Sequence, residues 1–207
     1  MMGSPANEPG RHENEAQSTV QITKGFWLCE TEMTQGAWRD VMGMAPESNP
    51  QHPVTSVSWE DCRSFIAKLP KPYPGWRFDL PTEAQWEYAC RAGTQSAFAG
   101  DIDSMGWHFE NSKARVQAIA LKAPNSWGLY DMHGNVFEWC RDSYRERLSG
   151  GSNPFVNDKS DNSLRVRRGG SWYYRHSACR SAYRLGDPPD FKTGHLGFRL
   201  ALVPDGL

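Results

Sequence analysis

The chain has 207 residues and a formal net charge of −1, from 23 basic and 24 acidic residues. This balance provides no basic surface for nucleic acid or for an anionic membrane, and no apolar run reaches the ~20 residues that a transmembrane helix needs. Hydrophobic residues make up only 38% of the chain, yet there are nine Trp, nine Phe and seven Tyr beside 19 Gly and 14 Pro. The composition favours one loop-rich domain with a core closed by large aromatic side chains.

The first 18 residues are polar and lack the apolar stretch of a signal peptide. We predict that residues 1–18 form a disordered tail and that a single domain occupies residues 19–207. Because neither a signal peptide nor a transmembrane helix is visible, the sequence does not assign a location. The cytoplasm, and display on a virion or cell surface through partners, both stay open.

Predicted helices dominate the first half of the domain. Residues 19–30 are rich in β-branched and aromatic residues, which predicts a strand. Three helices are expected after it, each opened by a residue type that caps helices. The capping residues are Thr34, Ser58 (with Asp61 completing a capping box) and Thr82 (with Gln85 completing a second one).

Loops and short strands are predicted for the second half. Residues 94–126 show little periodicity, and a strand is expected from about Val136. A polar loop follows, and then three short strands within residues 165–174, 179–184 and 196–202. Helices early and strands late indicate an α+β domain.

A series of motifs runs through the chain in a fixed order: ETEMTQGAW, HPVTSVSWEDC, RFDLPTEAQWEYACRAG, NSWGLYDMHGNVFEWC, RRGGSW and GFRLAL. In content and order they resemble the formylglycine-generating enzyme, or sulfatase-modifying-factor, family, from about residue 24 to about residue 202. The resemblance implies a variant of the C-type lectin fold, loop-rich, with short strands and two or three helices.

The same resemblance argues against catalysis. Oxidases of this family use two cysteines, five positions apart and shortly after the GGS sequence, to hold copper, because a soft Cu(I) ion prefers paired thiolates. Here the first of those positions falls on Tyr174, and only Cys179 remains. We therefore expect no copper and no enzyme activity. A formylglycine-generating-type oxidase, or another enzyme of the same fold acting through other residues, is the alternative.

The segment from about residue 172 to about residue 196 resembles the variable region of proteins diversified by diversity-generating retroelements. In those proteins a reverse transcriptase miscopies template adenines, so that Asn codons become codons for a restricted set of residues. The positions between fixed-looking blocks here all belong to that set, except Lys192. They are Tyr173, Tyr174, Arg175, His176, Ser177, Tyr183, Leu185, Gly186, Asp187, Asp190, Phe191, Lys192, Thr193, Gly194 and His195.

These residue types suit recognition, since Tyr and Arg are common anchors of binding energy. We predict a non-catalytic ligand-binding protein that displays variable side chains on a C-type lectin scaffold. Its ligand is unknown, and a protein or surface receptor is expected rather than nucleic acid. A lectin-like binding module that is not diversified is the second alternative.

A calcium site is also implied by the family resemblance. Oxygen-only ligation suits Ca²⁺, and the motif would supply carboxylates from Asp131 and Glu138 and backbone carbonyls from Gly134 and Val136. The alternative is that the two carboxylates cap turns or pair with arginines. The candidate arginines are Arg180, Arg184 and Arg199, and Arg199 is expected to be a buried structural partner of a carboxylate.

Overall fold

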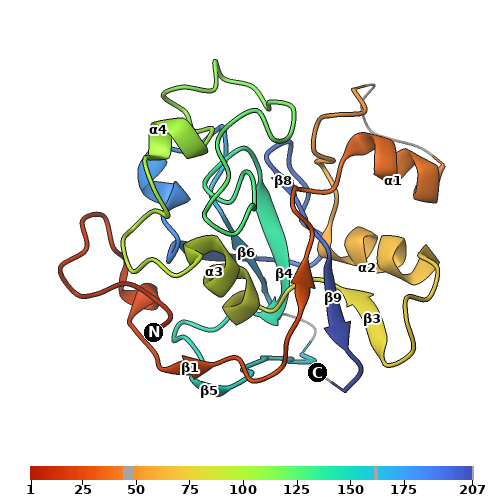
Figure 1. Cartoon of the computed structure of the whole chain (residues 1–207), viewed down its shortest axis with the longest axis horizontal. Helices are drawn as coiled ribbons and strands as arrows, with labels where there is room; N and C mark the ends of the chain where they lie inside the picture. The colour runs from red at the N-terminus through yellow and green to blue at the C-terminus, as the bar shows by residue number, and fades with distance from the viewer. Residues whose placement is uncertain (44–48, 161–162, 207) are drawn as a thin grey trace.

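A computed structural model describes residues 1–43, 49–160 and 163–206. The first half holds a 3₁₀ helix η1 (Glu13–Glu15), β1 (Val20–Gln21), β2 (Trp27–Leu28), α1 (Gln35–Met42), α2 (Trp59–Lys68), β3 (Trp76–Asp79), α3 (Glu83–Arg91) and α4 (Ile102–Met105). The second half holds β4 (Phe137–Ser143), β5 (Gly151–Ser152), β6 (Arg165–Arg168), the 3₁₀ helix η2 (His176–Cys179), β7 (Arg184–Asp187), β8 (Leu196–Gly197) and β9 (Ala201–Pro204). Short elements joined by long loops form the α+β fold that the sequence predicts (Figure 1).

The three predicted helices begin at their predicted caps. Thr34 Oγ1 accepts the Ala37 N–H at 3.1 Å, which caps α1. Capping boxes at Ser58 and Thr82 open α2 and α3. α2 packs against α1 and β3, while α3 packs on β4 and β6 (Figure 1). Local capping therefore fixes the helix starts before any tertiary contact is considered.

The strands of the described residues form three small sheets, and β4 is an inner strand of the largest one. A four-stranded sheet has the order β7-β6-β4-β8, a three-stranded sheet has the order β2-β9-β3, and β1 pairs with β5. The expected strand over 19–30 is two separate strands, β1 and β2, in different sheets. The expected strand over 165–174 ends at Arg168, and most of 179–184 is not strand, with β7 beginning only at Arg184.

Aromatic side chains fill the core. The rings of Trp38 and Phe65 are stacked at 5.2 Å between centroids, and Phe198 meets both of them edge-on. Trp139 is fully buried, whereas Trp127 is 46% exposed and Trp172 is half-buried. The five cysteines are free thiols, and all but Cys29 are buried.

The N-terminal segment, residues 1–18, is not a disordered tail, so this prediction is wrong. Met2 and Glu15 are buried, and the Gly3 N–H donates to Glu87 Oε1 at 2.7 Å. Met2 and Ser18 form an antiparallel bridge. The segment is polar because it bonds to buried charged groups of the domain, such as Glu87 and Arg180, and not because it is disordered.

Candidate functional site

The predicted variable segment begins at a tight turn after β6. Gly169 and Gly170 both have positive φ, +98° and +74°. A Cβ atom on Gly170 would lie 2.5 Å from the Cys179 sulfur and 2.7 Å from the Ala178 carbonyl oxygen. Only glycine allows this approach, so the GGS sequence folds η2 back onto the end of β6.

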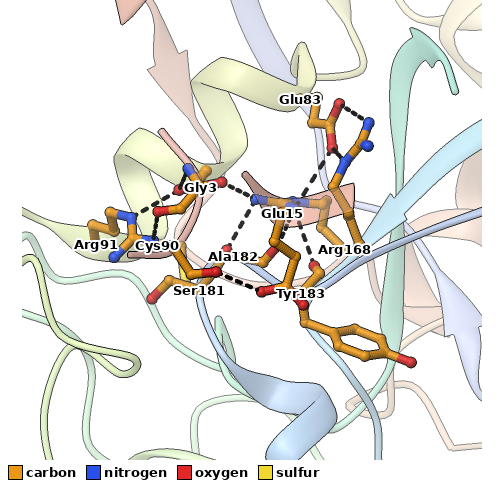
Figure 2. Close-up of polar contacts among 12 residues, drawn as sticks. Gly3, Glu15, Glu83, Cys90, Arg91, Arg168, Ser181, Ala182 and Tyr183 are labelled. Atoms are coloured by element: carbon orange, nitrogen blue, oxygen red, sulfur yellow. Dashed lines mark hydrogen bonds and ion pairs between the residues drawn. The ribbon is translucent and has the colours of Figure 1, made fainter. Parts of the chain in front are cut away.

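Arg168, at the end of β6, holds the main chain of the segment in place (Figure 2). Its Nη1 donates to the carbonyl oxygens of Ala182 and Tyr183 at 2.9 and 3.0 Å, and its Nη2 donates to that of Ser181 at 2.9 Å. The guanidinium is fully buried and forms an ion pair with Glu87 of α3. The backbone of the segment is therefore bonded to the interior of the domain, independently of the side chains that it displays.

Two further buried arginines anchor the segment through their own side chains. Arg180 donates to both carboxylate oxygens of Glu15, at 2.6 and 2.7 Å, and to Glu8 at 2.7 Å. Arg184 forms a bidentate pair with Glu83 at 2.6 and 2.9 Å. Hydrogen bonds to charged partners are the stronger kind, so these pairs fix the chain on both sides of Tyr183.

Burial separates the predicted variable positions from their neighbours. None of the predicted positions is buried, whereas residues 178–182 and Arg184, which lie between them, are; Pro188 and Pro189 are the intervening residues that are not buried. We call these positions the display face. Its exposed members are Tyr173, Arg175, His176, Ser177, Asp190 and Lys192, with Gly194, and its half-buried members are Tyr174, Tyr183, Leu185, Asp187, Phe191, Thr193 and His195, with Gly186. The intervening residues that are buried include Ala178, Cys179, Arg180, Ser181, Ala182, Arg184 and Leu196.

Four rings form an aromatic platform at the centre of the display face: Trp172, Tyr173, Tyr174 and His195. The Tyr173 and His195 rings are stacked at 5.3 Å and 10°, and Tyr173 is 57% exposed. Tyr174 meets the buried ring of Phe137 edge-on at 5.1 Å. The platform therefore extends outward from the core. Burial, together with the Arg167 charge, lowers the pKa of His195 to about 4.

The remaining display-face side chains are less free. Asp187 forms an ion pair with Arg167, and Lys192 forms one with Asp61 of α2 at 2.6 Å. Leu185 and Phe191 pack against the larger core cluster. Thr193 Oγ1 lies 3.0 Å from His195 Nδ1. The structure thus brings Tyr173, Tyr174 and His195 together, while Lys192 lies beside α2.

Tyr183 faces the N-terminal segment, which contributes to this surface. Its ring meets His12 edge-on at 5.6 Å between centroids. Sequence reasoning missed His12, because residues 1–18 were expected to be disordered. It also missed Trp172 and Arg167. The guanidinium of Arg167 lies 4.3 Å from the centre of the Phe137 ring. The sequence signal that could have identified Arg167 is its position directly before the RGGS sequence.

The thiols near the positions where family oxidases carry their copper-binding cysteines are buried. Burial raises the pKa of Cys179 and that of Cys90 to about 12. His133 lies between them: its Nδ1 bonds the Cys179 carbonyl oxygen at 2.8 Å, and its Nε2 accepts the Ala99 N–H at 3.0 Å. Burial lowers the pKa of His133 to about 4. The thiolate is the form that binds metals, and burial disfavours it at both cysteines.

Glu138, one of the two carboxylates expected to bind calcium, is already paired with an arginine. Both Glu138 oxygens accept hydrogen bonds from Arg199, each at 2.7 Å, and Oε2 also accepts the Trp86 indole N–H at 2.6 Å. A cation there would face a guanidinium at contact distance. Arg199 is thus the structural partner of a carboxylate, as the sequence indicated.

Asp131 is a separate case within that set. It is buried, and its Oδ2 accepts the Ala120 N–H at 2.8 Å, whereas its Oδ1 has no partner in the structure. Burial raises the pKa of Asp131 to about 6. Burial and two neighbouring carboxylates also raise the pKa of Glu32 well above its ordinary value. One arginine therefore compensates a group of three buried carboxylates, Glu32, Asp131 and Glu138.

Within the three described ranges, no helix is both long and apolar enough to cross a membrane.

Known proteins resemble this chain over nearly its whole length. The model of the sulfatase-modifying factor enzyme 1-like domain matches residues 1–203. The chain is 33% identical to the formylglycine-generating enzyme of Streptomyces coelicolor, over 81% of this chain and 56% of that protein. It is 30% identical to the inactive C-alpha-formylglycine-generating enzyme 2 of Bos taurus, over 89% of this chain and 62% of that protein. It therefore spans less than two thirds of either relative.

Among solved structures, Treponema denticola variable protein 1 superimposes with a TM-score of 0.85 at 26% identity, covering 99% of this chain and 92% of that one. The expected C-type lectin fold, in its formylglycine-generating-enzyme-like form, is thereby confirmed. With a family model that covers almost every residue and a relative one third identical, this chain belongs to the sulfatase-modifying factor enzyme 1-like family.

Proposed function

We propose that this protein is a non-catalytic ligand-binding protein whose display face is diversified by a retroelement. The observation that carries the proposal is the separation of burial between displayed and intervening residues. Side chains at the display positions can be exchanged while Arg168, Arg180 and Arg184 continue to hold the chain. A surface built for variation needs this independence of side chain and main chain.

Similarity supports the proposal from two directions. The likeness to Treponema denticola variable protein 1 extends over 99% of this chain. The likeness to an inactive relative in Bos taurus indicates that the family fold exists without catalysis. The ligand, by the chemistry of the aromatic platform, is a protein or surface receptor, since rigid Tyr and Trp rings provide contact area at low entropic cost.

The oxidase alternative is supported by the 33% identity to an enzyme. It requires a pair of thiolates, but Tyr174 stands at one of the expected positions and the pKa of Cys179 is raised to about 12. Copper titration of the purified protein, with oxygen consumption measured on a cysteine-containing peptide, tests this alternative. Stoichiometric copper binding with peptide-dependent oxygen uptake would establish the enzyme and refute the proposal.

The decisive experiment for diversification is to sequence the same locus in several isolates. We expect substitutions to concentrate at the display-face positions, with a template repeat and a reverse-transcriptase gene nearby. The intervening buried residues serve as the internal control, because retroelement copying should leave them unchanged. Substitutions spread evenly over displayed and intervening positions would favour the non-diversified lectin-like module instead.

A further inference from the structure

Three side chains with metal-binding atoms meet at the edge of the display face. They are His108 and Glu110, from the loop after α4, and His176, the first residue of η2. One ligand atom from each lies within 4.8 Å of the others. His176 is exposed, whereas the His108 side chain is only 4% exposed. This cluster is separate from the buried carboxylates around Arg199 and from the cysteines.

The imidazole of His108 is oriented by its surroundings. Its Nε2 lies 3.0 Å from Asp103 Oδ1, and its Nδ1 lies 2.7 Å from Glu110 Oε2. Asn111 Nδ2 lies 2.9 Å from Nε2, but its two hydrogens have other acceptors in Asp103 Oδ1 and the Gly106 carbonyl oxygen. Nε2 can therefore donate to Asp103, while a proton lies between Nδ1 and Glu110, and a metal bound at Nδ1 would replace that proton. Metal-binding histidines are commonly held by such a carboxylate.

We propose that His108, Glu110 and His176 form a Zn²⁺ site with water as the fourth ligand. His108 Nδ1, one Glu110 oxygen and His176 Nδ1 would be the protein ligands. The His176 Nδ1 to Glu110 Oε1 distance is 3.7 Å, and the His108 Nδ1 to Glu110 Oε2 distance is 2.7 Å. The two distances end on different oxygens of the Glu110 carboxylate, and each lies near the ~3.3 Å between ligand atoms around a tetrahedral zinc ion. Small rotations of the exposed Glu110 and His176 side chains would bring one carboxylate oxygen to this distance from both imidazoles.

The donor chemistry selects the class of metal. Two imidazoles and one carboxylate suit Zn²⁺, whereas Ca²⁺ and Mg²⁺ prefer oxygen ligands. Three protein ligands and an open fourth position distinguish this site from closed structural zinc sites. The site also links η2 to the loop after α4. In that loop the Phe109 N–H already donates to the carbonyl oxygen of Tyr174, just before η2, at 2.8 Å. If the proposed diversification holds, zinc binding belongs to variants that carry histidine at position 176.

The test is calorimetric titration of the full chain with ZnCl₂, after removal of any histidine tag and treatment with a chelator. We expect one Zn²⁺ per chain, and visible d–d absorption of tetrahedral type when Co²⁺ replaces zinc. His176→Ala should weaken binding by at least about tenfold, the lower end of the effect of losing even an outer partner of a metal ligand. Because His176 is exposed, this variant should keep its fold.

His195→Ala is the matched control, since His195 lies in the same segment but not among the three ligands. Its zinc affinity should equal that of the wild type. Asp103→Asn should weaken binding about 10- to 100-fold, as expected for a residue that positions a ligand, and should change the Co²⁺ spectrum. Absence of stoichiometric zinc binding by the wild type, or equal loss in His176→Ala and His195→Ala, would overturn the site whatever the fate of the proposed function.

Discussion

The guanidinium of Arg180 donates to both oxygens of Glu15, at 2.6 and 2.7 Å, and so joins the display segment to a residue 165 positions earlier in the chain. Both side chains are buried. Burial alone would raise the pKa of Glu15, but the hydrogen bonds and charge of Arg180 lower it overall. The N-terminal segment is therefore held against the display face by charge as well as by packing.

Replacing Glu15 by Gln should destabilise the protein, because Arg180 would lose a buried countercharge. Removing one partner of a buried pair costs about 3–5 kcal/mol, and the remaining bond to Glu8 should limit the loss in the free energy of unfolding to about 2–3 kcal/mol. Urea denaturation measures it. Glu13→Gln, in the same 3₁₀ helix but exposed, is the control and should have little effect. Equal stability of the two variants would contradict this role of Glu15.

Arg168→Met should be among the most destabilising single changes in the display scaffold. It removes one of the two arginines that pair with Glu87, the other being Arg91, and takes a donor from three carbonyl oxygens. We expect a loss of about 3–5 kcal/mol in the free energy of unfolding. Arg175→Met, at an exposed position nearby, should change it by less than about 0.5 kcal/mol. A stable Arg168→Met variant would show that the segment keeps its conformation without this anchor.

Display-face positions should differ in their tolerance of alanine. Tyr173→Ala removes a mostly exposed ring and should leave the melting temperature nearly unchanged. The same change should lower the affinity for any ligand that binds the aromatic platform. Phe191→Ala and Tyr174→Ala should lower it, since both rings pack against the core cluster. Thermal unfolding of the three variants measures the difference. A large loss in Tyr173→Ala would mean that this ring supports the fold.

Asp131→Asn should stabilise the protein at high pH. The folded pKa of Asp131 is about 6, above its ordinary 3.8, so the folded state binds more protons than the unfolded state between these values. Stability from this group is therefore lost as pH rises from about 4 to about 6. The variant removes that loss, worth up to about 3 kcal/mol at pH 8, and Asn tolerates the φ of +57° at this position.

Unfolding in urea at pH 4 and pH 8 measures the effect. The advantage of Asp131→Asn should be large at pH 8 and small at pH 4. An advantage of equal size at both values would mean that the charge of Asp131 is not its cause.

Calcium should have little effect on stability, since Glu138 is occupied by Arg199 and Trp86. We expect no saturable heat on titration with CaCl₂ and no rise in melting temperature. An ion that binds only the folded state must raise its stability. A calcium-dependent rise that Asp131→Asn abolishes would restore the expected site, with Glu138 released from Arg199.

Sequence reasoning recovered the features that depend on local pattern. Helix starts at Thr34, Ser58 and Thr82 were predictable, because capping uses residues three positions apart. The exposed Tyr173 was also predictable, from the resemblance to a variable region, whereas the GGS turn was not, because a strand was expected over 165–174. Arg199 as a buried partner of a carboxylate followed from its position between core residues.

The features that were missed depend on distant pairs. The N-terminal segment is polar, and nothing local shows that its Glu15 meets Arg180. The metal cluster joins His176 to residues more than 60 positions earlier, and none of the three stands in a recognisable metal-binding motif. Charges that pair across the fold look like surface charges in a sequence, which is why the ion pair of Glu15 and Arg180 was not predicted.

The hydrogen bonds from Arg168 end on carbonyl oxygens, and every amino acid has one. Mutation at Tyr183 would therefore preserve the bond to its own carbonyl, whatever side chain replaced it. The size of the substituted side chain is restricted at this position, because the Tyr183 ring occupies the space between Phe137 and His12. Substitutions on the display face should accordingly be tolerated widely in charge and polarity at exposed positions and narrowly in side-chain volume at half-buried ones.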